Sequence, residues 1–351
     1  MNKPSRDAQN SNRVSTHTSL ATELALQSDQ ALAALLNEAT PIGTSIGGTS
    51  ALIEVHGRKI FVKKIRLTDR ERHPQNIMST RNIFALPLYY QYGIGSTGFG
   101  VWRELTTHLM TTHWVLTGEC QNFPILYHWR ILPEMIHKPT ITELEKLEQD
   151  VKYWQDSQAV RARLEANLRG SANVVLFLEY IPQNLYQWLG NQLLQGEAVV
   201  ESACKMVEDH LKETTAFMNS KGLLHFDAHF HNILTDGNRL YFTDFGLALS
   251  SEFELSEEEI IFFNHHVNYD RCSTATNFLH CLITHYFGPD KWPAALEEYK
   301  EGNSKVLPPS VLSIINRYAS VALLMDKFYR SLQKNKQTPY PNKELEDSWI
   351  T

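Results

Sequence analysis

The chain has 351 residues, a formal net charge of −6 and a hydrophobic content of 42%. This length allows either one two-lobed domain with two sizeable cores or two ordinary domains. The composition is that of a globular protein and excludes a fibrous repeat or wholesale disorder. The acidic charge balance argues against bulk nucleic acid as the main partner, because such proteins usually carry a concentrated basic surface.

No segment of the sequence predicts export or membrane insertion. The polar N-terminal residues lack the apolar stretch of a secretory signal, and the longest apolar runs, such as Val174 to Leu178, are far too short to cross a bilayer. The four cysteines include no C-x-x-C pair of the kind that binds zinc, so we interpret them as thiols without disulfides. The expected location is therefore a reducing cytoplasm.

The patterns along the chain predict two parts of different class. Residues 1–16 are polar and are expected to be a flexible tail, while residues 17–40 keep apolar residues at helical spacing, which predicts one amphipathic helix. Residues 41–182 contain β-type runs separated by glycine turns, including a hairpin at His56-Gly57. Residues 183–351 are mostly helical in pattern. The expected fold class is α+β, with two lobes and a cleft between them.

Two insertions interrupt the β-rich part. Residues from about 66 to 98 predict a long loop that either lines an acceptor site or caps the lobe, followed by a helix from Phe99 to Leu116. Within the loop, Gly93 to Gly98 fits G-x-G-x-x-G by letter, but no clean strand precedes it, so we interpret it as a loop and helix entry. Residues from about 133 to 173 are rich in charge and predict a long helix or a pair, either solvated or binding a partner.

The residues that carry most functional information lie between His225 and Gly246. His225-x-Asp227 is followed by Asn232, and an Asp-Phe-Gly sequence begins at Asp244 after a predicted hairpin. These two motifs, in this order, resemble the catalytic loop H-x-D-x-x-x-x-N and the metal-binding D-F-G turn of the protein-kinase-like superfamily. The resemblance implies a β-rich N-lobe, a mainly helical C-lobe with the active site in the cleft, and transfer of the γ-phosphate of ATP to a hydroxyl.

The same resemblance implies a role for each motif residue. Asp227 would be the base that accepts the proton of the acceptor hydroxyl, and Asn232 and Asp244 would hold Mg²⁺, because a transferring phosphoryl group needs its charge neutralised and its acceptor oriented. His225 is expected to act through packing and hydrogen bonding. Asp270 resembles the aspartate that opens a long buried helix and ties down the catalytic loop.

The nucleotide phosphates would be bound by residues near the start of the β-rich part. The glycine-rich segment predicts either a phosphate cover or a plain hairpin turn, and its candidate binding residues are Gly43, Gly47, Gly48, Thr49 and Ser50. Two adjacent lysines lie on the next strand, and only one of them can face the phosphates because neighbouring strand residues point to opposite faces. Alignment with the family favours Lys63 over Lys64. The expected ion-pair partner of Lys63 is Glu104. The alternative interpretation is that Glu104 is an ordinary surface residue.

The adenine pocket follows from the same alignment. The sequence LFLEYIP resembles the hinge between the lobes, so the backbone C=O of Glu179 and the N–H of Ile181 would meet the adenine edge. Leu178 would form the back of the pocket, and Leu234 would underlie the ring. These assignments depend on the fold.

Departures from the family pattern leave the acceptor open. Eukaryotic-type protein kinases carry lysine two residues after the catalytic aspartate, where this chain has His229, as in the aminoglycoside and choline kinase branch. No A-P-E motif lies between Gly246 and Asp270. The resemblance spans about Pro41 to Phe287. The leading expectation is a serine/threonine protein kinase; the alternatives are a small-molecule kinase and, from another class, a nucleotide-binding pseudokinase scaffold.

Overall fold

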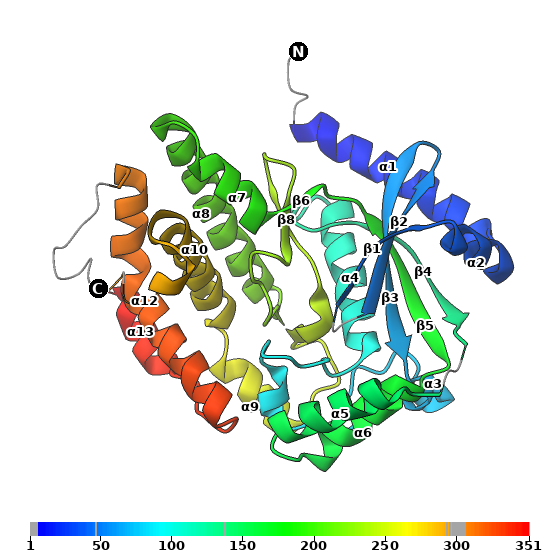
Figure 1. Cartoon of the computed structure of the whole chain (residues 1–351). Coiled ribbons are helices and arrows are strands. Elements are labelled where there is room, and N and C mark those ends of the chain that lie inside the picture. The colour runs from blue at the N-terminus through cyan, green and yellow to red at the C-terminus, as the bar shows by residue number, and fades with distance from the viewer. Residues whose placement is uncertain are drawn as a thin grey trace. The chain divides into compact units, whose positions relative to one another are not determined.

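The computed structural model describes residues 6–45, 48–135, 138–292, 294, 296 and 307–350. It is an α+β structure that separates into two compact units (Figure 1). The first unit comprises the described residues of Met1–Tyr180, together with Asp244–Ala248 and Phe253–Ser256. The second comprises those of Ile181–Thr243, Leu249–Glu252 and Glu257–Thr351.

The first unit is built on a five-stranded antiparallel sheet with the strand order β1-β2-β3-β5-β4. The strands are β1 (Thr40–Ser45), β2 (Gly48–Val55), β3 (Arg58–Leu67), β4 (Leu126–Pro133) and β5 (Ala172–Glu179). The predicted hairpin between β2 and β3 is confirmed, with φ values of 50° at His56 and 72° at Gly57. Positive φ at both turn residues matches the right-handed twist of the strands that the turn connects.

The core of this unit lies between the sheet and helix α4 (Val101–Leu116). Trp102 and Leu105 of α4 pack against a row of side chains that includes Val174 and Leu176 of β5. Phe177, which points to the other face of the sheet, is also fully buried. The continuous apolar run of β5 therefore reflects a central strand that is covered on both faces.

The N-terminal region differs from the expectation. Helix α1 (Arg6–Leu26) begins well inside the segment expected to be a flexible tail, and a second helix, α2 (Asp29–Asn37), follows a break where the side chain of Ser28 caps it. Residues 1–5 lie outside the described residues. The tail prediction is wrong from Arg6 onward because α1 has tertiary partners: it lies against β4 and buries Leu20 and Leu24.

Arg13 is the polar anchor of α1. Its guanidinium donates to both carboxylate oxygens of Glu179, at 3.1 and 2.6 Å, and to the backbone oxygens of Gln121 and Phe123. Arg13 and Glu179 side chains are only 10% and 16% exposed. A second ion pair, from Arg130 of β4 to Asp29 of α2, is much more exposed.

Substitutions of Arg13 and Arg130 test whether the more buried ion pair contributes more to the free energy of unfolding. We expect Arg13→Gln to lower the free energy of unfolding by about 2 kcal/mol, because it leaves the carboxylate of Glu179 without its charged donor. Arg130→Gln is the matched control and should cost less than about 1 kcal/mol, as exposed pairs do. Urea denaturation of both variants measures the difference; equal costs would contradict the assignment of Arg13 as the anchor.

The two insertions fold against each other. The first contains the short helices α3 (Asp69–Arg72), η1 (Pro74–Asn76) and η2 (Leu88–Gln91), and the second forms the adjacent helices α5 (Ile141–Tyr153) and α6 (Gln158–Arg169) (Figure 1). Phe84 and Tyr90 of the first pack with Trp154 and Val160 of the second in a separate small core. Of the two expected forms of the second insertion, the pair of helices is present.

The second unit is mainly helical. Its helices are α7 (Leu185–Leu193), α8 (Glu197–Ser220), α9 (Glu257–His265), α10 (Tyr269–Phe287), η4 (Pro289–Lys291), α12 (Pro309–Lys334) and α13 (Asn342–Ile350). Its short strands are β6 (Gln183–Asn184), β7 (Leu223–Leu224), β8 (Ile233–Thr235), β9 (Leu240–Phe242) and β10 (Leu249–Ser250). Helix α10 is buried against α8 and α12. The predicted hairpin around Asp236-Gly237 is confirmed as β8 and β9.

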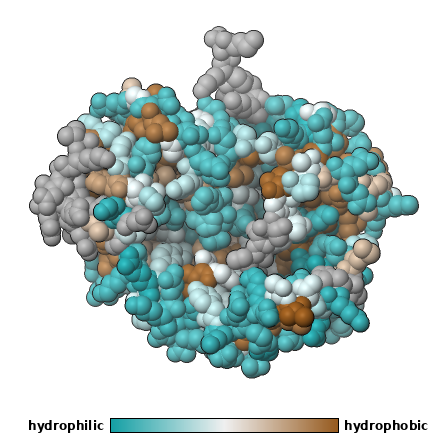
Figure 2. Space-filling view, viewed as in Figure 1, coloured by the Kyte–Doolittle hydropathy of each residue, from teal (hydrophilic) through white to brown (hydrophobic). Residues whose placement is uncertain are grey.

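The face drawn in Figure 2 is largely hydrophilic, with hydrophobic residues in small separate groups. Across the described part of the chain, no helix has the length and apolar character needed to cross a membrane. All four cysteines lie in this part, and no disulfide forms between them.

Candidate functional site

A buried cluster of charged side chains forms in the first unit around Lys63. Its Nζ lies 2.6 Å from Glu104 Oε1 and 2.7 Å from Asp244 Oδ1. The side chains of Lys63 and Glu104 are 8% and 4% exposed, whereas that of Asp244 is 34% exposed. Lys64, the next residue along β3, points to the other face of the sheet because side chains alternate along a strand, and it is only half-buried. The expected pairing of Lys63 with Glu104 is therefore present.

The charges in this cluster depend on each other. Burial lowers the pKa of the Lys63 ammonium, but the carboxylates of Asp244 and Glu104 outweigh burial and hold that pKa above its usual range. Burial raises the pKa of Glu104 although Lys63 opposes this shift. With one ammonium between two carboxylates, the three ionised side chains together carry a net negative charge. Its partly exposed member, Asp244, is therefore a suitable ligand for a cation.

The turn that carries Asp244 is held in a strained conformation. Asp244 has φ 63° and ψ 71°, a left-handed conformation that is unfavourable for a residue with a side chain. The next residue, Phe245, is buried in η3 (Phe245–Leu247) with its ring 4.8 Å from that of His108 on α4 and 6.3 Å from that of Phe123. Packing of Phe245 and the ion pair to Lys63 therefore fix the turn from both sides, and they place it in the first unit although the sequence assigned it to the helical part.

The glycine-rich segment from Gly93 to Gly98 includes one position, Gly98, where only glycine fits. A Cβ atom at this position would lie 2.1 Å from the carbonyl oxygen of Gly246, and the φ of Gly98 is +74°. The amide of Gln91 also donates to the carbonyl oxygen of Leu247. The cluster belongs to a loop before α4, as expected, and its glycine lets the first insertion approach the backbone of the Asp-Phe-Gly turn.

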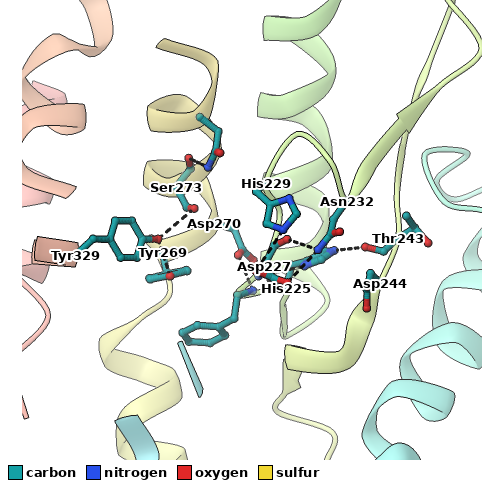
Figure 3. A network of polar contacts seen from close by, with 12 residues as sticks. His225, Asp227, His229, Asn232, Thr243, Asp244, Tyr269, Asp270, Ser273 and Tyr329 are labelled. Carbon is teal, nitrogen blue, oxygen red and sulfur yellow. Dashed lines mark hydrogen bonds and ion pairs between the residues drawn. The ribbon is translucent and has the colours of Figure 1, made fainter. Parts of the chain in front are cut away.

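A second polar cluster lies in the second unit, in the loop from His225 to Asn232 (Figure 3). The backbone N–H of Asp227 donates to Nδ1 of the buried His225 ring at 3.3 Å, so Nε2 carries the proton and donates to the carbonyl oxygen of Thr243 at 3.0 Å. Asn232 Nδ2 donates to Asp227 Oδ2 at 2.9 Å and to its backbone oxygen at 3.1 Å. The Asp227 side chain is 25% exposed, and His229 Nε2 lies 3.9 Å from its Oδ1.

Asp270, in the first turn of α10, holds the start of this loop. Its two carboxylate oxygens accept the backbone N–H groups of His225 at 2.6 Å and Phe226 at 2.9 Å. Phe226 has φ 62°, and its ring packs against that of Tyr269 at 4.6 Å. Burial raises the pKa of Asp270 to about 6, while the two backbone donors oppose the shift. The predicted tie between Asp270 and the loop is confirmed.

Substitution of Asp270 should destabilise the loop. Asp270→Asn leaves one of the two backbone N–H groups facing an amide NH₂, which should cost about 1–3 kcal/mol of unfolding free energy. Asp236→Asn is the matched control, since Asp236 Oδ1 also accepts two backbone N–H groups, those of Asn238 and Arg239, but in an exposed turn where asparagine serves equally well. Denaturation at pH 7 compares the two variants.

The pH dependence of the Asp270→Asn effect has a defined sign. Because the folded pKa of about 6 exceeds the ordinary value of 3.8, the folded wild type binds the proton more tightly, and its stability falls as pH rises from about 4 to 6. The variant lacks this titration, so its deficit should be larger at pH 4 than at pH 7. A deficit that grows with rising pH, or one no larger than that of Asp236→Asn, contradicts the assignment.

The predicted phosphate-cover residues that the structure describes lie in β1 and β2. Gly43 is paired with Ser50, whose hydroxyl donates to the Gly43 carbonyl oxygen at 3.3 Å. Thr49 is exposed, and Gly48 must be glycine because a Cβ there would lie 2.0 Å from the backbone oxygen of Lys64. Gly47 lies outside the described residues.

The predicted adenine-pocket residues are divided between the units. Leu178 is in the core of the first unit, and the backbone N–H of Glu179 donates to the Ile125 oxygen at 2.8 Å. Ile181 begins the second unit, where Leu234 is half-buried in β8. The contact of the Glu179 carboxylate with Arg13 was missed, because nothing in the local sequence pattern marks a partner 166 residues away.

Neither a search for metal-ligand clusters nor comparison with known proteins assigns a function to further residues. No group of three or more His, Cys, Asp or Glu side chains that could hold a metal ion occurs among the described residues. A comparison with models of known protein families finds no match, and a search of curated proteins finds none either.

Proposed function

We propose that this protein is an ATP-dependent phosphotransferase with a two-lobed, protein-kinase-like fold, which transfers the γ-phosphate of Mg·ATP to a hydroxyl group. The observation that carries the proposal is the buried cluster of Lys63, Glu104 and Asp244, since their positions in the sequence do not by themselves require these side chains to meet. The same residue types, in the same chain order, resemble the phosphate-binding lysine, its glutamate partner and the metal-binding aspartate of kinases.

The donor chemistry of the chain fits Mg²⁺ together with a nucleotide. Mg²⁺ is commonly bound through one or two protein oxygen ligands and the phosphates of its substrate. Asp244 offers a partly exposed carboxylate, and Asn232 offers an amide oxygen, since its nitrogen donates to Asp227. When bound, the metal neutralises charge on the phosphate oxygens. Lys63 would place its ammonium on the α- and β-phosphates, held in position by Glu104.

Asp227 is the proposed base. Its carboxylate is partly exposed, and Asn232 holds Oδ2 at 2.9 Å, which fixes the orientation of the group. A carboxylate fixed in this way would orient the acceptor hydroxyl and take its proton as the oxygen attacks the γ-phosphorus, while the bond to the β–γ bridging oxygen breaks and ADP leaves. The proposal requires that Asp227 and the cluster around Lys63 act on the same nucleotide.

The leading acceptor is Ser or Thr of a protein, and one observation favours a small-molecule alcohol as the alternative. His229, which stands where protein kinases carry lysine, is 40% exposed and lies 3.9 Å from Asp227 Oδ1. The imidazole is a hydrogen-bonding group suited to a polar acceptor. A nucleotide-binding scaffold without transfer activity is the outcome that would replace both.

The experiment that tests the function follows labelled γ-phosphate from Mg·ATP to the protein itself, to added proteins and to a panel of small alcohols and aminoglycosides. We expect transfer by the wild type, and a loss of roughly 10²-fold or more in Asp227→Asn with Mg·ATP affinity nearly unchanged, because this change removes only the positioned base. Asp244→Asn should weaken Mg·ATP binding as well as turnover, because it removes a metal ligand.

Calorimetric titration and single-turnover rates measure binding and transfer separately in both variants. Nucleotide binding by the wild type without transfer or hydrolysis would favour the scaffold. Full transfer by Asp227→Asn, or wild-type Mg·ATP affinity in Asp244→Asn, would show that the two roles are assigned wrongly.

The choice between the two lysines makes a separate prediction. Lys63→Met removes the cation between Glu104 and Asp244 while it keeps most of the side-chain length, and we expect transfer to fall by roughly 10²-fold. Lys64→Met, on the other face of the same strand, should change transfer by less than about threefold. Single-turnover rates, with circular dichroism to verify folding, decide the matter; equal losses would reverse the assignment.

A further inference from the structure

Helix α4 carries Glu104 in its first turn, so whatever fixes the start of this helix also fixes the partner of Lys63. Val101 is the first residue of α4, and its backbone N–H donates to Glu71 Oε1 at 2.9 Å. The indole N–H of Trp102 donates to the backbone oxygen of Glu71 at 3.0 Å. A carboxylate at this end is also favoured by the helix dipole.

Glu71 itself is held ionised inside the protein. It is 1% exposed, and its Oε2 lies 2.8 Å from NH1 of Arg163 on α6, which is 3% exposed. Oε2 also accepts the hydroxyl of Thr68 at 2.6 Å in a capping box that opens α3. Burial raises the pKa of Glu71, but Arg163, Thr68 and the Val101 N–H together keep the pKa below its usual value.

Arg163 joins the second insertion to this contact. Its guanidinium stacks over the ring of Phe84, 5.1 Å from the ring centroid, in the small core shared by the two insertions. The first insertion therefore supplies the Glu71 carboxylate that accepts the N–H at the start of α4, and the second insertion supplies the Arg163 guanidinium that neutralises it. Neither insertion is needed to complete the sheet.

The first insertion also holds the chain that follows the Asp-Phe-Gly turn. Arg103 Nε donates to the Thr80 carbonyl oxygen at 2.7 Å, and the Glu254 carboxylate accepts the Ser79 hydroxyl at 2.7 Å and the Thr80 N–H at 3.2 Å. The backbone N–H of Glu254 donates to the Thr80 hydroxyl at 2.8 Å. Through Ser79 and Thr80, the insertion fixes both α4 and Phe253–Ser256.

We propose that Glu71 is a positioning residue, which holds α4 where Glu104 meets Lys63, and that the two insertions form a permanent brace around it. The consequence for turnover rests on the proposed function, whereas the effect on α4 does not.

The test replaces the buried ion pair in two ways, which differ in whether position 71 keeps an oxygen that can accept the Val101 N–H. Glu71→Leu/Arg163→Met removes both charges and leaves the Val101 N–H without an acceptor. Glu71→Gln/Arg163→Met also removes both charges but keeps an amide oxygen for that N–H. Removing both partners avoids the large cost of a single unpaired buried charge. Glu143→Leu is a further control, because Glu143 belongs to the same kind of capping box at the exposed start of α5.

Two readouts are compared in each variant. Amide hydrogen exchange of residues 101–105, measured by mass spectrometry, reports the start of α4 without any need for activity. We expect it to rise at least about tenfold in the Leu variant and to stay near wild type in the Gln variant and in Glu143→Leu. Single-turnover transfer from ATP should fall by roughly 10²-fold in the Leu variant only, the scale of a misplacement of about 1 Å.

Each outcome decides the proposal. Wild-type exchange at 101–105 in the Leu variant overturns it, and so do equal increases in the Leu and Gln variants, since the acceptor oxygen would then not be what holds the helix. If the wild type transfers no phosphate, the proposed function fails but the exchange data still decide the role of Glu71.

If the Leu variant does not fold, Val101→Pro replaces it. Proline is tolerated at the first position of a helix and has no N–H for Glu71 to accept. Val101→Ala keeps the N–H and is its control. Faster exchange of the first turn in Val101→Pro than in Val101→Ala supports the proposal, and equal exchange overturns it.

Discussion

A buried lysine ammonium needs an opposite charge beside it. Two carboxylates from distant segments of the chain contact the ammonium of Lys63. Glu104 arrives on α4, 41 residues after Lys63, and Asp244 on a turn 181 residues after it. Because an uncompensated buried charge is costly, the ammonium favours the conformation in which both segments lie against β3. The left-handed backbone of Asp244 is the local cost of that arrangement.

Each unit also contains a buried carboxylate that accepts main-chain hydrogen bonds. In the first unit, Glu71 receives the start of α4 and is neutralised by Arg163. In the second, Asp270 accepts the backbone N–H groups of His225 and Phe226 and holds the loop that carries Asp227. In both places a charged group satisfies main-chain donors that would otherwise be buried without a partner. The side chains proposed for chemistry are thus fixed through backbone contacts of their neighbours.

Parts of this organisation could be predicted from local patterns. The spacing from His225 to Asn232 and the turn at Asp236-Gly237 predicted the loop and its hairpin. Strand alternation placed Lys63 and Lys64 on opposite faces, and alignment with the family motif favoured Lys63. The capping-box pattern from Thr68 to Glu71 is local as well, but our sequence analysis did not predict the helix that it begins. The N-terminal helices were predicted less well, because the polar sequence around Arg13 is ordered by contacts with residues more than one hundred positions away.

The sequence by itself determined which groups are present and on which local elements they lie, because short-range hydrogen bonding and periodicity act within a few residues. It did not determine that Glu71 meets both Val101 and Arg163, or that Gly98 is needed for the approach to Gly246. Those contacts join segments that are far apart in the chain. Only tertiary packing decides them, since burial in a common core sets which distant charges must neutralise each other.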